Sequence, residues 1–190
     1  MDIIKKMDKK GFTLIEMLTT TAILVVVFAL LAIIFGRATS IHRIVRSGGD
    51  AENLGIYLIN TITYGPGVNR EKGLISAKPL SLNANTKTDT LTFQDSDGQS
   101  VRYIMDGSSV KYQVGTIYVD LKPSWATDRQ LEIVPGSGFY YYNAVGAEET
   151  TLGNPIYAVG VRLVLKNTLQ NIQEAVTLYR YVRVRNQIAF

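Results

Sequence analysis

The stretch KKGFTLIEMLTTTAILVVVFALLAIIFG, from Lys9 to Gly36, decides how the N-terminal part of the chain must fold. The 20 residues from Met17 to Gly36 contain no charged side chain. A helix of that length spans about 30 Å, the thickness of the hydrocarbon core of a bilayer. Apolar side chains surround this helix on every side, so it has no face for water. We expect a membrane-spanning helix, because lipid offers the backbone no other hydrogen-bond partner.

Three interpretations of this segment compete: a secretory signal peptide, a plain single-pass anchor, and a membrane helix whose acidic residue has a partner. A secretory signal peptide usually has an apolar run of about 7–15 residues that ends in small residues. The run here is longer, and Phe35-Gly36-Arg37-Ala38 makes a poor cleavage site. A plain single-pass anchor fits the length but does not explain Glu16, because a carboxylate costs roughly 2.5–3.5 kcal/mol near the membrane centre and less toward the interface. Either Glu16 reaches the lipid headgroups, or it has a partner.

The segment KKGFTLIEML, from Lys9 to Leu18, resembles the precursor signature of type IV pilins and pseudopilins. That signature consists of a short basic leader, a glycine, Phe-Thr-Leu-Ile-Glu and a long apolar helix, and every element is present in order. The resemblance covers the first 36 residues. It implies that a prepilin peptidase cuts between Gly11 and Phe12 and that the new Phe12 amine is methylated. Glu16 then becomes the fifth residue of the mature chain, where the family carries a glutamate.

The spacing between Phe12 and Glu16 has a physical explanation. Cleavage creates a cation at Phe12, four residues before Glu16. When helices bundle out of water, the Glu16 carboxylate of one subunit can meet the Phe12 ammonium of its neighbour, and the pairing offsets the desolvation of both charges. Gly11 suits a peptidase because the missing side chain lets the backbone approach closely. We therefore expect Phe12 and Glu16 to direct assembly, with no catalytic residue, no cofactor and no metal.

Composition limits the chemistry of the rest of the chain. Cysteine is absent, which excludes disulfides, thiolate metal sites and cysteine nucleophiles. His42 is the only histidine, and we expect it to face solvent. Of the net charge of +4, residues 1–10 contribute +2, and the other +2 is spread over 180 residues, which argues against a nucleic-acid-binding surface. The leader's lysines instead indicate an orientation signal, because Lys-rich flanks stay on the cytoplasmic side of an inserting segment.

The expected fold class is α+β, with a long N-terminal transmembrane helix packed on an antiparallel β-sheet, and the pilin resemblance implies the same architecture. We expect a cleaved leader over 1–11, a transmembrane and filament-core helix over 12–36, an amphipathic continuation over 37–64 and a β-rich outer domain over 65–190. Ser47-Gly48-Gly49-Asp50 interrupts the helical pattern. We favour a kink there over two separate helices, with Asp50 as a possible N-cap of the restart.

The outer part of the helix and the strands follow from periodicity. Five residues at helical spacing are expected to pack on a sheet: Leu54, Tyr57, Leu58, Thr61 and Ile62. Gly65-Pro66-Gly67 should end the helix, and residues 68–88 should form a loop with a short strand at 74–76. Further strands are expected at 90–94, 100–105, 109–114, 116–121, 139–143, 157–166 and 174–185. The last two should form a C-terminal hairpin.

The C-terminal half looks most like the larger minor subunits, of the J-type pseudopilin or W-type minor pilin kind. This looser resemblance rests on the strand from Val161 to Leu165 and on VTLYRYVRVRN, Val176 to Asn186. The chain departs from many pilins in lacking the cysteines of a C-terminal disulfide loop, which puts adhesive functions of such loops in doubt.

The preferred function is therefore a structural subunit, a minor pilin or pseudopilin of a type IV pilus, type II secretion or competence filament, and not an enzyme. The implied partners are other pilin or pseudopilin subunits, prepilin peptidase, an inner-membrane assembly platform and membrane lipid. The N-terminus would be cytoplasmic, and the outer domain periplasmic or extracellular.

A second hypothesis is a membrane-tethered binding module whose β-domain holds DNA, carbohydrate or calcium. Asp95-Ser96-Asp97-Gly98 resembles the opening of a calcium loop, but the twelfth position is Asp106 rather than glutamate. A hairpin turn is the favoured interpretation, because Asp-Gly is a strong hairpin signal.

Two more patterns in the outer domain have alternative interpretations. Tyr140-Tyr141-Tyr142 places aromatic rings on both faces of one strand. One face should pack in the core, and the other could contact carbohydrate, bases or a neighbouring subunit. Arg183 and Arg185 share a strand face while Arg180 points the other way, so a basic stripe for DNA would be short and solvated arginines are favoured.

Overall fold

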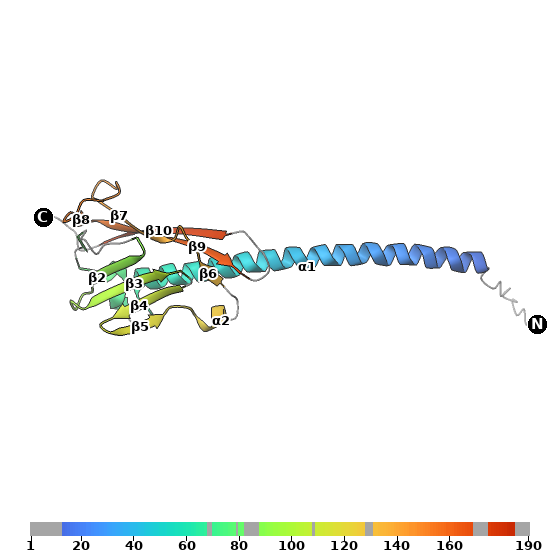
Figure 1. Cartoon of the computed structure of the whole chain (residues 1–190), viewed down its shortest axis with the longest axis horizontal. Helices are drawn as coiled ribbons and strands as arrows, with labels where there is room; N and C mark the ends of the chain where they lie inside the picture. Colours follow the sequence, from blue (N-terminus) through green and yellow to red (C-terminus); the bar gives the residue numbers. More distant parts are fainter. Residues whose placement is uncertain are drawn as a thin grey trace, which may run out of the picture. The chain divides into compact units, whose positions relative to one another are not determined.

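The computed structural model describes residues 13–67, 70–78, 80–81, 88–107, 109–127, 131–168 and 175–184. It confirms the α+β class, with a long N-terminal helix and antiparallel sheets (Figure 1). The chain divides into two compact units, Met1–Ile44 and Val45–Phe190, and the helix contributes to both. The helical elements are α1 Leu14–Tyr64, η1 Arg70–Lys72, η2 Leu74–Ser76 and α2 Ser124–Thr127. The strands are β1 Leu80–Ser81, β2 Thr90–Gln94, β3 Ser100–Asp106, β4 Ser109–Val114, β5 Ile117–Asp120, β6 Leu131–Ile133, β7 Gly138–Tyr142, β8 Pro155–Ile156, β9 Ala158–Asn167 and β10 Ala175–Arg183.

Helix α1 continues through the segment that was expected to interrupt it. Gly48 and Gly49 are helical, and Asp50 lies inside α1 rather than at an N-cap, so the N-cap interpretation is wrong. Ser47 and Ala51 on either side are buried in the second unit, and tertiary packing of this kind compensates for the poor helix propensity of glycine. A bend at this point stays a prediction.

The predicted end of the helix is confirmed. Gly65 follows Tyr64 with a φ of 91°, a left-handed conformation that glycine adopts without a steric penalty. Its backbone N–H donates a hydrogen bond of 2.8 Å to the carbonyl of Thr61. This is the common way in which a glycine closes the last turn of a helix.

The strands of the second unit form antiparallel sheets. One sheet has the order β2-β3-β4-β5, and β1 pairs with β8. In the other sheet β9 pairs with β10 on one side and with β6 and β7 on the other. The predicted β2–β3 and β3–β4 hairpins and the C-terminal β9–β10 hairpin are confirmed.

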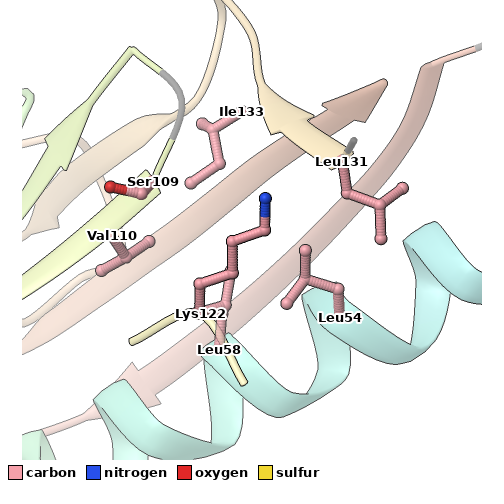
Figure 2. Close-up of a pocket in the computed structure, with 7 residues that line it drawn as sticks. All are labelled: Leu54, Leu58, Ser109, Val110, Lys122, Leu131 and Ile133. Carbon is pink, nitrogen blue, oxygen red and sulfur yellow. The ribbon is translucent and has the colours of Figure 1, made fainter. Parts of the chain in front are cut away.

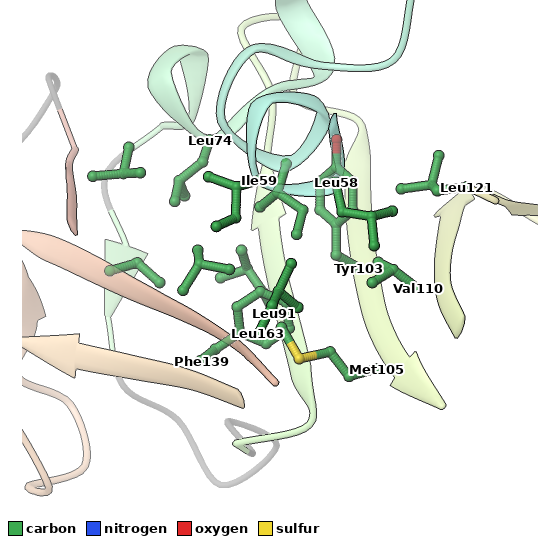
Figure 3. Packing of buried hydrophobic residues seen from close by; sticks show 14 of the residues in the cluster. Leu58, Ile59, Leu74, Leu91, Tyr103, Met105, Val110, Leu121, Phe139 and Leu163 are labelled. Carbon is green, nitrogen blue, oxygen red and sulfur yellow. The ribbon is translucent and has the colours of Figure 1, made fainter. Parts of the chain in front are cut away.

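The C-terminal part of α1 lies in the hydrophobic core. Four of the five residues expected to pack on a sheet are buried: Leu54, Leu58, Thr61 and Ile62. The prediction for Tyr57 is wrong, because this residue is 39% exposed. Figure 3 shows the helix residues facing side chains from both large sheets, including Phe139 and Leu163 from β7 and β9.

The buried Tyr103 also ties the end of the helix to η1. Its hydroxyl is placed to donate to the carbonyls of Thr61 at 3.2 Å and of Lys72 at 3.0 Å. The core therefore fixes the end of α1 and the residues that follow it.

Candidate functional site

Of the predicted processing and assembly residues, the structure describes Glu16, at the start of α1. Gly11 and Phe12 are outside the described residues, so their roles stay predictions. Glu16 is in the first turn of α1 and is exposed. Helix α1 is long and apolar enough to cross a membrane by length and composition.

Glu16 forms a capping box with Thr13, the residue just before the helix. The backbone N–H and the hydroxyl of Thr13 both donate to Oε2 of Glu16, each at 2.9 Å. The backbone N–H of Glu16 donates to the Thr13 hydroxyl oxygen at 3.3 Å. Such reciprocal bonds satisfy backbone donors that the first turn would otherwise leave without partners.

The role of Thr13 was not predicted, although its signal is present in the sequence. Thr-x-x-Glu is the spacing of a capping box, and here it runs from Thr13 to Glu16, just before the uncharged run. Both bonds from Thr13 go to Oε2, and no described residue donates a hydrogen bond to Oε1. The capping box therefore orders the carboxylate within a single subunit and leaves one of its oxygens for another donor.

The next threonines are satisfied by their own helix. The hydroxyl of Thr20 donates to the carbonyl of Glu16 at 2.7 Å, and that of Thr21 to the carbonyl of Met17 at 2.7 Å. These internal bonds matter because an unsatisfied hydroxyl in hydrocarbon is costly. The polar residues at the head of the apolar run are thus compatible with lipid or with a helix bundle.

The residues that the structure describes leave the N-terminal part of α1 uncovered in the single chain. Every described residue from 13 to 46 is exposed, including Leu31, Phe35 and Val45. Soluble monomers rarely expose contiguous apolar patches larger than a few hundred Å². This segment needs lipid, other helices or both around it.

The described residues of the second unit, Val45–Phe190, border a small gap and a larger open depression. An apolar gap of about 10 Å³ lies between α1 and the strands, bordered by Leu54, Val110 and Leu131 (Figure 2). A gap of this size holds at most a single water molecule. An open depression of about 400 Å³ lies beside Tyr57, Asn60 and Tyr64, on a flank of α1.

Arg180 lies beside that depression. Its guanidinium donates to Oδ1 of Asn60 at 2.7 Å and to the hydroxyl of Tyr64 at 3.0 Å. The prediction that Arg180 and Arg183 point to opposite faces of β10 is confirmed, because Arg180 turns toward α1 while Arg183 is exposed. Arg185 lies outside the described residues.

The Asp95 to Gly98 segment is the predicted hairpin turn between β2 and β3. The Asp95 carboxylate is fully buried and forms a salt bridge with Lys72 of η1. It also accepts a 2.8 Å hydrogen bond from the backbone N–H of Gln99. Among the residues that the structure describes, no group of three or more His, Cys, Asp or Glu side chains could hold a metal ion. The buried aspartate therefore joins η1 to the hairpin.

The pKa values of this pair follow from its surroundings. Burial alone would raise the pKa of Asp95, but the hydrogen bonds from Lys72 and Gln99 outweigh it and hold the pKa below its ordinary value. The hydrogen bond to Asp95 raises the pKa of Lys72. The pair therefore contributes stability above about pH 4, where unfolded aspartate ionises, and loses it as pH falls through the native pKa. On the basic side, the contribution of Lys72 is complete below about pH 10 and is lost as pH rises through its native pKa.

We expect Asp95→Asn to lower the free energy of unfolding by about 1.5–3 kcal/mol at pH 7, because the ammonium of Lys72 loses a charged partner. Urea unfolding at pH 7 and at about pH 3 measures this, and the difference from the unchanged protein should shrink at the lower pH. Asp106→Asn is the matched control, since the Asp106–Lys111 bridge is exposed and should contribute no more than about 1 kcal/mol. Equal losses in the two variants would contradict the prediction.

Two further predictions concern single side chains. His42 is exposed, as predicted. Tyr141 is buried in the core and donates to the carbonyl of Thr90 at 3.0 Å, whereas Tyr140 and Tyr142 are half-exposed on the opposite face. The predicted division of the tyrosine triplet between two faces is confirmed.

Comparison with known proteins bears on the N-terminal segment. Residues 6–35 match the family model described as the prokaryotic N-terminal methylation motif. The motif indicates a type IV pilin-like precursor. Precursors of this kind are cut by prepilin peptidase, assemble with other pilin subunits and act as structural rather than catalytic proteins. Comparison of the chain with curated proteins and with solved structures gave no significant match.

Proposed function

We propose that the chain is a filament subunit, a minor pilin or pseudopilin of a type IV pilus, type II secretion or competence apparatus. After cleavage between Gly11 and Phe12, α1 would leave the cytoplasmic membrane laterally and pack among the helices of other subunits on an inner-membrane assembly platform. The outer domain would then lie in the periplasm or outside the cell. The J-type or W-type subtype belongs to the same proposal.

The observation that carries the proposal is the pairing of the methylation motif with an ordered carboxylate on an uncovered apolar helix. A carboxylate that enters a helix bundle needs a cationic partner, since the desolvation of a single charge is very costly. The Phe12 amine of a neighbour is such a cation, and Thr13 holds Glu16 in a defined geometry before that neighbour arrives. Register between subunits would follow from this single ion pair.

Mass spectrometry of the protein purified from filaments tests the processing step. We expect the mature chain to begin at Phe12 with one added methyl group on its amine. Gly11→Val is the control variant, because a branched side chain at the cutting site should keep the leader attached. Filaments that contain the protein with residues 1–11 still attached would overturn the proposal.

A further inference from the structure

The outer face of one sheet carries a cluster of aromatic side chains. On strands β7, β9 and β10, the residues that are paired across the sheet point to the same side. One such row consists of Tyr140, Gly160 and Tyr181, and the next consists of Tyr142, Ala158 and Arg183. With Tyr179 they form what we call the tyrosine face, which lies opposite the side that packs on α1. Tyr179 and Tyr181 are 51% and 49% exposed.

The rings of the tyrosine face are held in place by one another. The hydroxyls of Tyr142 and Tyr179 form a hydrogen bond of 2.6 Å, and the rings of Tyr142 and Tyr181 pack with centroids 5.3 Å apart. Gly160 makes room for this arrangement, because a Cβ there would lie 2.3 Å from the Tyr179 hydroxyl. Side chains ordered in advance lose little conformational entropy when a partner binds. Tyrosine and arginine are also residue types that dominate binding at protein interfaces.

The tyrosine face has an acidic residue at one edge and a basic residue at the other, and the exposed Arg162 lies beside Tyr179 on its middle strand. An isolated bridge pairs Glu148 with Tyr142, so one row reads Glu148, Tyr142, Ala158, Arg183 across the sheet. With neighbouring strands about 4.8 Å apart, its acidic and basic ends are about 14 Å apart. Both ends are exposed, and neither forms a salt bridge with another residue that the structure describes.

A row with this order is complementary to itself. Rotation by 180° about an axis in the plane of the face, perpendicular to the row and through its middle, exchanges the two ends. Glu148 of each copy then faces Arg183 of the other. Matching of a patch to itself in this way is the requirement for a twofold contact between identical chains.

We propose that the tyrosine face is a contact site for the tyrosine face of a second copy of this chain, with Glu148 and Arg183 paired reciprocally. Four tyrosines cannot bury the roughly 800 Å² per partner of a standard interface, so the contact is weak in dilute solution. Confinement to a membrane or alignment along filaments raises the effective concentration of one copy near another and makes the contact persistent. The contact goes beyond assembly through α1 and does not depend on Glu16.

Cysteine cross-linking of the full chain in detergent micelles tests the contact, since the protein contains no cysteine. In Tyr140→Cys the new thiol lies beside the proposed axis, and a short bifunctional maleimide should give a covalent dimer. Tyr118→Cys is the matched control: Tyr118 is 56% exposed, but on β5, which belongs to another sheet. Both variants also carry Glu16→Ala, so that contacts between the apolar helices through Glu16 do not contribute.

Charge reversal supplies the decisive comparison. Arg183→Glu or Glu148→Arg alone should weaken the association about tenfold, because like charges then face each other. The two changes together should restore it, whereas Arg102→Glu on β3 should have no effect. Equal dimer yields from Tyr140→Cys and Tyr118→Cys, or a double reversal that does not restore the dimer, would overturn the proposal. If the partner were of another kind, such as a glycan or a different subunit, the double charge reversal would not restore the dimer.

Discussion

Glu16→Ala should reduce incorporation of the mature subunit into filaments by at least about 100-fold while leaving it in the membrane. Removal of one partner of a buried ion pair costs about 3–5 kcal/mol, because the other charge remains buried without compensation. Each 1.4 kcal/mol corresponds to about a tenfold change in an equilibrium constant. Insertion should not suffer, since loss of a carboxylate favours transfer into lipid. Immunoblots of sheared filaments and of membranes measure the two pools separately.

Two further variants separate the charge of Glu16 from its hydrogen bonds. Glu16→Gln keeps an acceptor for Thr13 but loses the charge, and we expect a defect close to that of Glu16→Ala. Thr13→Val removes the capping hydroxyl, which costs about 1 kcal/mol, and should lower incorporation only a few-fold. Normal filaments from Glu16→Gln would contradict ion pairing as the driving force.

The N-terminal helix could be predicted because the relevant signals are local. An uncharged run of 20 residues admits few structures in lipid. The segment KKGFTLIEML, from Lys9 to Leu18, is a specific sequence pattern. The contribution of Thr13 was missed because Glu16 was expected to reach either the lipid headgroups or a partner in another subunit. In the single chain, Oε2 of Glu16 already accepts two hydrogen bonds from Thr13.

The strands that could be predicted from the sequence are those with period-2 alternation and a turn signal at their ends, such as β2, β3 and β9. Short elements without a periodic pattern could not be identified, which explains why β1, β6, β8 and α2 were missed. The strand expected at 74–76 is wrong, because these residues form η2 and Leu74 is buried under the end of α1. Tertiary packing, which no local pattern reports, decides the conformation of such segments.

Burial was harder to predict than secondary structure. Tyr57 follows Leu54 at helical spacing but lies on the flank of α1, beside Asn60 and Tyr64. The strand expected at 116–121 is present as β5 at one edge of its sheet, and all four residues of β5 are exposed. Similarly, periodicity places Tyr140 and Tyr142 on one face but cannot show that Gly160 and β10 complete it.

Gly73→Ala should lower the free energy of unfolding of the second unit by about 1–3 kcal/mol or more. Losses of this size are found when extra atoms are forced into a packed interior. Gly73 lies between η1 and η2, where the chain passes directly against the end of α1. A Cβ there would lie 2.3 Å from the carbonyl carbon of Tyr64 and 2.4 Å from the backbone nitrogen of Gly65. Backbone atoms cannot rotate away as a side chain can, so η1 or the end of the helix must move. Urea unfolding of the full chain in detergent, followed by near-ultraviolet circular dichroism, measures the loss.

Gly48→Ala is the matched control, because it adds the same methyl group where nothing lies within 4 Å of the new Cβ. Gly48 is inside α1, so alanine there should stabilise the helix by up to about 1 kcal/mol through its higher propensity. The two substitutions should therefore shift the unfolding midpoint in opposite directions. A Gly73→Ala variant as stable as the unchanged protein would mean that the segment after the helix does not pack against Tyr64 and Gly65. The positions of η1 and of the Lys72–Asp95 salt bridge that holds the β2–β3 hairpin would then both be wrong.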